Sequence, residues 1–116
     1  MPNPVVHFEI GCRDNAATQT FYSQLFGWSM NPMGPATMID TGSIPGVPSI
    51  AGHFSSLGHE PHNYVTVYVQ VEDIEASIAK AVELGGKCLV KPVKIPMGTF
   101  AWIADIDGNI VGLWST

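Results

Sequence analysis

Two side chains that could do chemistry together lie near the start of the chain. His7 and Glu9 stand two residues apart in "VVHFEI" (5–10), among apolar neighbours. On a strand, residues at this spacing project from the same face. An imidazole beside a carboxylate can bind a divalent metal ion or act as a general base. Because a protein metal site usually needs at least three ligands, the pair would need partners from elsewhere in the chain.

Composition limits the classes of protein to which the chain can belong. With 116 residues, 46% of them hydrophobic and 13% charged, the sequence predicts one compact domain with a sizeable core. The net charge of −5 argues against nucleic acid as a partner and mildly favours neutral or cationic ligands. We therefore expect a small-molecule ligand.

From the sequence we expect neither a secretion signal nor a membrane span. Its first ten residues, "MPNPVVHFEI", lack a basic flank, and no run of about 18 apolar residues occurs. We expect a cytoplasmic protein with no membrane partner. Cys12 and Cys88 lie in strand-like apolar contexts without a short metal-binding spacing, and we expect both to be buried, reduced thiols.

The sequence repeats itself. Residues 7–28 align with residues 66–87 at an offset of 59, which places Asp14 on Asp73. "IAGHFS" (50–55) aligns with "IVGLWS" (110–115) at an offset of 60. We interpret the pattern as two copies of one supersecondary unit, a first module at about 4–56 and a second at about 64–115.

Each copy has the pattern of a strand, a helix and three further strands. In the first, "VVHFEIGC" alternates apolar and polar residues, Asp14 can cap the following helix, and Gly27 can end it. In the second, "YVTVYVQV" is strand-like, and Asp73 precedes an amphipathic helix. The prediction is an α+β domain with two small curved sheets and helices outside.

Three segments resemble a known superfamily. They are "FYSQLFGW" (21–28), "VEDIEASIAKAVELGGKCL" (71–89) and "IPMGTFAWIADIDGNIVGLW" (95–114). The chain resembles the vicinal oxygen chelate (VOC) superfamily, which includes glyoxalases, bleomycin-resistance proteins and extradiol dioxygenases. Ile106 departs from the pattern, because a proline usually follows the aspartate. The resemblance spans essentially the whole chain and implies tandem βαβββ modules that form a curved sheet cup.

The resemblance also indicates where a metal would bind. Metal-dependent members of the superfamily take one ligand from the first strand and one from the last strand of each module. These positions fall on His7 and Thr66 for the first strands, and on Gly52 and Gly112 for the last. Glycine has no side-chain donor and threonine is a poor ligand, so we expect no bound metal and no other cofactor. A site of His7 and Glu9 alone would hold an ion weakly.

The remaining histidines are not expected to supply ligands. His59 and His62 lie in the linker "SLGHEPHN" (56–63), where histidines are usually solvated. His53 aligns with Leu113 at the offset of 60 and should face the helix side, either packed or at a subunit contact.

The two glycines are expected to open space in the cup. Apolar and polar side chains that share their faces would then line a ligand pocket, although the same volume could simply be core. The predicted ligand-binding residues are Gly52, Phe54, Thr66, Tyr68, Gln70, Trp102, Gly112 and Trp114. His7 and Glu9 are the predicted catalytic pair, should the protein be an enzyme.

Three functions are compatible with these residues. The first is metal-free binding of a small organic molecule, planar or cationic, as in bleomycin-resistance proteins. The second is an enzyme of lyase or isomerase type in which His7, paired with Glu9, acts as general base on a carbonyl substrate. The third, a metal-dependent glyoxalase-type lyase, is opposed by the ligand count. Modules of this superfamily commonly pair across subunits, so we also expect a homodimer.

Overall fold

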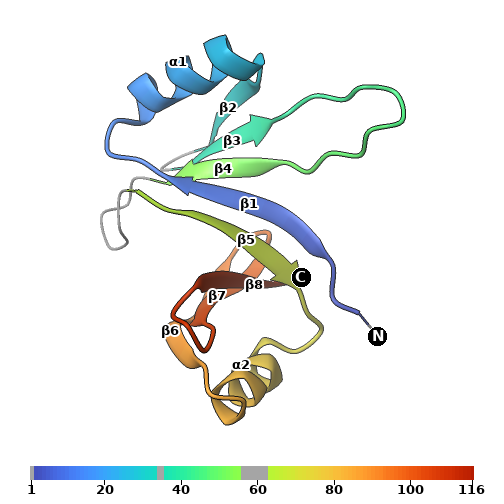
Figure 1. The fold of residues 1–116 in the computed structure, drawn as a ribbon, viewed down its shortest axis with the longest axis vertical. Coiled ribbons are helices and arrows are strands. Elements are labelled where there is room, and N and C mark those ends of the chain that lie inside the picture. Colours follow the sequence, from blue (N-terminus) through green and yellow to red (C-terminus); the bar gives the residue numbers. More distant parts are fainter. Residues whose placement is uncertain (1, 34–35, 56–62) are drawn as a thin grey trace. The chain divides into compact units, whose positions relative to one another are not determined.

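The computed structural model describes residues 2–33, 36–55 and 63–116, within which it has two compact units (Figure 1). The first unit is His7–Val65, and the second combines Met1–Val6 with Thr66–Thr116. In chain order, the structure repeats a strand, a helix and three strands twice, which confirms the predicted α+β class. No helix in these ranges is long and apolar enough to cross a membrane.

The first unit has one helix and a small mixed sheet. Its elements are β1 (Val5–Gly11, of which His7–Gly11 belong to this unit), α1 (Asn15–Phe26), β2 (Ser29–Met33), β3 (Ala36–Asp40) and β4 (Gly52–Ser55). The strand order is β2-β3-β4-β1, in which β4 runs parallel to β1 and antiparallel to β3. The parallel pair is possible because α1, β2 and β3 form a long connection between its two strands.

The two faces of strand β1 differ, because one carries apolar side chains and the other polar side chains. Ile10 and Cys12 are buried with Ile39 and Phe54, and the aromatic side chains of Phe8, Tyr22 and Trp28 pack on this cluster. Helix α1 begins where Asp14 accepts a hydrogen bond from the Ala17 amide at 3.1 Å. Since side chains alternate along a strand, the odd-numbered His7 and Glu9 lie on the face opposite α1.

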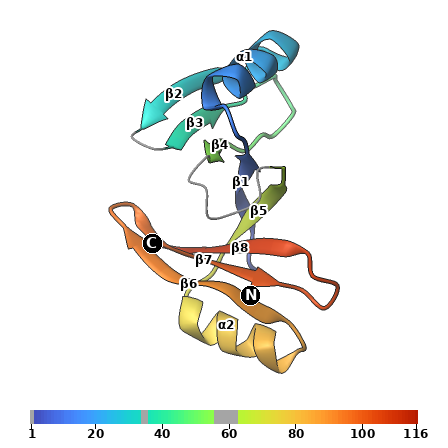
Figure 2. The same ribbon diagram turned by 90° about the vertical axis from the view of Figure 1, so that its left-hand side faces the viewer.

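The second unit repeats this plan. Its elements are β5 (Val65–Gln70), α2 (Ile74–Glu83), β6 (Lys87–Ile95), β7 (Gly98–Ala104) and β8 (Ile110–Ser115), in the order β5-β8-β7-β6 (Figure 2). Ile74 of α2 is buried with Val71, Ala101 and Leu113. The side chains that alternate with these, including Tyr68 and Trp102, therefore lie on the face opposite α2.

The strand registers correct the predicted alignment of the two modules. Glu9 pairs with His53 in the first unit, and Tyr68 pairs with Gly112 in the second. The paired residues are 44 positions apart in both units, so the first and the last strands must share one offset. Ile10 and Phe54 in the helix-side core of the first unit match Val69 and Leu113 in that of the second, which fixes this offset at 59. The repeat therefore keeps one offset, and the offset of 60 for the last strands is wrong by one residue. A slip of one residue moves every side chain to the other face of a strand.

This alignment error of one residue affects the predictions for three residues of β4. His53 lies on the face of His7 and Glu9, not on the helix side, because directly paired residues share a face. Gly52 pairs with Phe8 on the α1 face, and Phe54 is completely buried in the core. Gly52 and Phe54 were predicted to bind ligand; neither is on the face of the candidate site.

The prediction that the glycines open space is also wrong. A Cβ atom on Gly112 would overlap the ring of Tyr68, and one on Gly52 would overlap Phe8. Tyr68 is 5% exposed and receives a hydrogen bond from Trp102, so its ring cannot move aside freely. Both positions are glycine because an aromatic ring lies flat against the neighbouring strand.

We expect Gly112→Ala to lower the free energy of unfolding by about 1–3 kcal/mol, because the added methyl group overpacks a rigid site. Urea unfolding measures the loss. In a Tyr68→Ala background the same substitution should cost much less, since the obstructing ring is gone. An equal cost in both backgrounds would show that Tyr68 is not the obstacle.

Candidate functional site

Four side chains of the first unit are linked through hydrogen bonds and an ion-pair contact, and we call them the polar network: His7, Glu9, His53 and Tyr64. Glu9 is buried, only 4% exposed, and the Tyr64 hydroxyl donates to its Oε2. Its Oε1 lies 3.1 Å from Nε2 of His53. Nδ1 of His53 lies 2.7 Å from Nε2 of His7. Three titratable groups and a phenol are thus linked end to end.

Local backbone structure accounts for this convergence. His7 and Glu9 point the same way from β1, and the parallel pairing of β4 places His53 directly beside Glu9. The Gly11 amide donates to the Tyr64 carbonyl oxygen at 3.0 Å, which holds Tyr64 next to β1. The site thus combines residues 46 and 55 positions apart in sequence.

Burial controls the charge of His7. The pKa of His7 is lowered from 6.5 to about 4. Burial away from solvent is the largest cause and the neighbouring His53 the next, while Glu9 partly opposes the shift. His7 is therefore an uncharged imidazole at pH 7. It can accept or donate a hydrogen bond, and it contributes no positive charge to the site.

The residues do not fit a metal centre. With the corrected register, His53 replaces Gly52 among the ligand positions that the resemblance implies, beside His7, Thr66 and Gly112. The two imidazoles direct ring nitrogens at each other, and the Thr66 hydroxyl donates to the Ile110 carbonyl oxygen at 2.7 Å. Within residues 2–33, 36–55 and 63–116, no group of three or more His, Cys, Asp or Glu side chains is arranged to hold an ion. His59 and His62 lie outside the described residues.

The second unit brings together part of the predicted ligand-binding set. Indole Nε1 of Trp102 donates to the Tyr68 hydroxyl at 2.8 Å, and Gly112 lies opposite both residues in the sheet. Gln70 is exposed and pairs with the half-buried Trp114. Their role in ligand binding stays a prediction.

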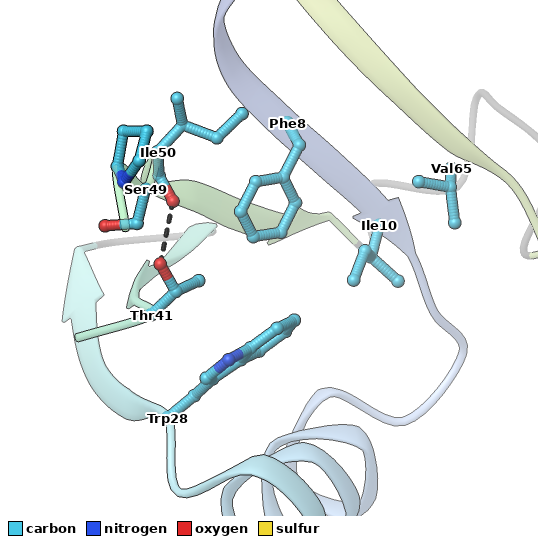
Figure 3. A pocket seen from close by; sticks show the side chains of 8 residues that line it. Phe8, Ile10, Trp28, Thr41, Ser49, Ile50 and Val65 are labelled. Atoms are coloured by element: carbon cyan, nitrogen blue, oxygen red, sulfur yellow. Dashed lines mark hydrogen bonds between the residues drawn. The ribbon is translucent and has the colours of Figure 1, made fainter. Parts of the chain in front are cut away.

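A pocket that sequence reasoning missed lies on the α1 side of β1 (Figure 3). It has a volume of about 580 Å³ and is lined by Phe8, Ile10, Trp28, Thr41, Pro48, Ser49, Ile50 and Val65. Phe8 and Trp28 both point into it, and the Thr41 hydroxyl donates to the Ile50 carbonyl oxygen at 2.9 Å. The alternation of Phe8 and Ile10 with His7 and Glu9 is the sequence signal for this second, apolar surface.

Comparison with known proteins identifies the family. The model of the glyoxalase-like domain family matches residues 6–111. The chain belongs to this family. A glyoxalase/bleomycin resistance protein/dioxygenase superfamily member from Vibrio splendidus has the same fold, with a TM-score of 0.62 at 16% identity over 97% of both chains. The predicted membership of the VOC superfamily is thereby confirmed.

Two relatives indicate how widely the domain is used. The putative glyoxylase CFP32 of Mycobacterium tuberculosis is 30% identical over 107 residues, 87% of this chain and 41% of that protein. The anthracycline biosynthesis protein DnrV of Streptomyces peucetius is 26% identical over 131 residues, 97% of this chain and 47% of that protein. The chain thus spans less than half the length of these relatives.

A solved enzyme shares the fold at low identity. A variant of Streptomyces coelicolor methylmalonyl-CoA epimerase, in complex with 2-nitronate-propionyl-CoA, gives a TM-score of 0.70 at 15% identity over 100% of this chain and 99% of that chain. At this identity the likeness shows the fold alone.

The lowered pKa of His7 makes stability depend on pH. Because the folded pKa of about 4 is below the unfolded value of 6.5, the unfolded chain takes up the proton first. His7 should therefore favour unfolding progressively as the pH falls from about 6.5 to about 4. We expect the stability difference between the wild type and His7→Gln to shift in favour of the variant over this range, as measured by urea unfolding at each pH. Parallel pH profiles would contradict the assignment.

Proposed function

We propose that the chain is a metal-independent binding domain for a small organic molecule, and that the ligand contacts the polar network of His7, Glu9, His53 and Tyr64. The supporting observation is the buried Glu9 carboxylate, linked through His53 to His7 on the face opposite α1. Burying ionisable groups costs stability unless they are paired, and apolar residues would pack as well. A network of this kind is better explained by recognition of a ligand than by folding.

The charge of His7 favours binding over catalysis. A general base works best when its pKa is near the working pH, whereas His7, with a pKa of about 4, is a weak base at pH 7. The loss of basicity does not prevent His7 from taking part in a hydrogen bond. We therefore rank a lyase or isomerase with His7 and Glu9 as general base second, and a metal-dependent lyase third.

The relatives support an organic ligand. One is named for anthracycline biosynthesis, and a solved structure with the same fold holds a coenzyme A derivative. For the second unit, taken by itself, we propose as ligand contacts the residues that share the face opposite α2. They are Thr66, Tyr68, Gln70, Trp102, Gly112 and Trp114.

Binding can be tested on metal-stripped protein with a panel of aromatic and carbonyl fragments, observed by ¹H–¹⁵N NMR. We expect fragments to shift the signals of His7, Glu9 and His53, and a chelator to leave both the shifts and the melting temperature unchanged. Glu9→Gln should weaken binding, because the amide can no longer accept from both neighbours. Val82→Thr, at an exposed position on α2, is the matched control.

Two results would contradict this proposal. One is a fragment response that requires added zinc, nickel or manganese, since the network is proposed to act without metal. The other is a set of shifts confined to residues outside the polar network and the proposed contacts in the second unit.

We also propose a homodimer that associates through α1. Phe21, Leu25 and Phe26 of this helix are 57–59% exposed, an unusual proportion for large apolar side chains close together. The outer strands β2 and β6 contain Pro32 and Pro92, which cannot donate hydrogen bonds to another strand and so disfavour edge pairing.

Sedimentation should show a dimer at tens of micromolar, and Leu25→Asp should convert it to monomer by burying a charge in the interface. The equivalent change on the other helix, Val82→Asp, should leave the dimer intact. A monomeric wild type at this concentration would exclude the dimer.

A further inference from the structure

The connection between β3 and β4 is longer than the repeated fold requires. It runs over residues 41–51, whereas the second unit makes the corresponding connection, between β7 and β8, with residues 105–109. In that short turn, Asp105 accepts hydrogen bonds from the backbone amides of Asp107 and Asn109. Both units have the same strand order, so the extra residues of the first unit are not needed to build its sheet. Long ordered loops on a rigid scaffold often carry function.

Hydrogen bonds hold this long connection in place. The Thr41 hydroxyl donates to the Ile50 carbonyl oxygen at 2.9 Å, and the Ser49 hydroxyl donates to the Gly42 carbonyl oxygen at 2.8 Å. Both bonds join the first residues of the connection to its last ones. Its large apolar side chains nevertheless remain exposed, namely Ile44, Val47 and Ile50. The connection is therefore ordered without burying these side chains in the core.

The connection supplies one side of the pocket on the α1 side of β1 (Figure 3). Thr41, Pro48, Ser49 and Ile50 line it, and the hydrogens of both hydroxyls are used within the connection. Among the described residues that line the pocket, none is charged, and the Trp28 indole N–H is the only other side-chain donor. An ionised ligand would lose its hydration there without gaining a charged partner.

Aromatic rings form another part of the wall. Tyr22 of α1 stacks on the Trp28 indole, with an interplanar angle of 5° and ring centroids 5.2 Å apart. Tyr22 does not line the pocket, so the indole face turned away from it forms the wall. The Phe8 ring lies beside the indole, with centroids 5.7 Å apart and an inclination of 51°. Rings that are already held by their neighbours lose little conformational freedom when a ligand stacks on them.

We infer that this pocket is a second binding site, on the face of β1 opposite the polar network, for uncharged molecules with a flat, fused aromatic ring that stacks on Trp28. Its volume of about 580 Å³ lies within the range of roughly 300–1,000 Å³ of small-molecule pockets. The pocket and the polar network have no residue in common. The second site therefore does not depend on the proposed function.

Three probes with one carbon skeleton test the class of ligand: 2-naphthalenemethanol, its fully saturated analogue and 2-naphthoate. Contact between aromatic rings adds about twofold to tenfold in affinity beyond the effect of buried area, so the aromatic alcohol should bind more tightly than the saturated one by this factor. 2-Naphthoate should bind more weakly than the aromatic alcohol, because the pocket offers its charge no partner. NMR titrations that follow the Trp28 indole N–H signal give the three dissociation constants.

Intermolecular nuclear Overhauser effects locate the bound probe. We expect them between the ring of 2-naphthalenemethanol and the side chains of Phe8, Trp28 and Ile50. Effects to the rings of His7 and His53 alone would show that the probe binds the polar network, and would overturn the second site.

Two exchanges of valine for tryptophan provide a matched pair of variants. Val65→Trp adds a large ring at the edge of the pocket, and Val82→Trp adds the same ring on α2. The two valines are 69% and 51% exposed, so neither exchange overpacks the core. Val65→Trp should lower the affinity for 2-naphthalenemethanol to that of the saturated analogue, because the new ring takes up the space of the probe. Val82→Trp should keep the wild-type affinity.

Several results would overturn the inference. Equal affinities for the aromatic and the saturated alcohol, or tightest binding of 2-naphthoate, would exclude the inferred class of ligand. A Trp28 signal that does not respond to any probe at millimolar concentration would exclude the site. A Trp28 signal that shifts with protein concentration, and not with the probes, would show that a second copy of the chain covers the pocket instead. If Val65→Trp fails to fold, the probe series and the Overhauser effects still provide the test.

Discussion

The structure of the candidate site depends on one pairing, the parallel alignment of β1 with β4 that sets Glu9 beside His53. Moving β4 by one residue would bring Gly52 or Phe54 to Glu9 and send His53 to the other face of the sheet. The buried carboxylate would then lack its imidazole partner, at a cost that a small domain tolerates poorly. The register of β4 is therefore needed to form the polar network, and the contacts of the network in turn stabilise that register.

The alternation of β1 gives its two faces different properties. On one face, Phe8 and Ile10 contribute to the core and to an apolar pocket, where the Thr41 hydroxyl is already bonded to a carbonyl oxygen. On the other face, His7 and Glu9 both contact His53 in a network of polar side chains. An apolar surface selects ligands by shape and area, whereas polar side chains select them by their hydrogen-bonding groups. This difference is why the proposed recognition is assigned to the polar face.

The two modules have diverged in how they fill equivalent positions. His53 of the first module corresponds to Gly112 of the second, and Glu9 corresponds to Tyr68. In the first, the positions hold an imidazole and a carboxylate. In the second, the glycine makes room for the tyrosine ring, which accepts a hydrogen bond from Trp102. One backbone repeat thus supports a polar network in one unit and an aromatic pair in the other.

The sequence by itself determined the α+β class, the repeated order of elements, the helix caps at Asp14 and Asp73, and the family, because these depend on local patterns and short motifs. It also identified His7 and Glu9 as a pair on one face. Only the tertiary structure decided the partners of that pair, since His53 was placed on the wrong face by an alignment error of one residue. Strand register is set by pairing between distant segments, which composition and periodicity do not encode.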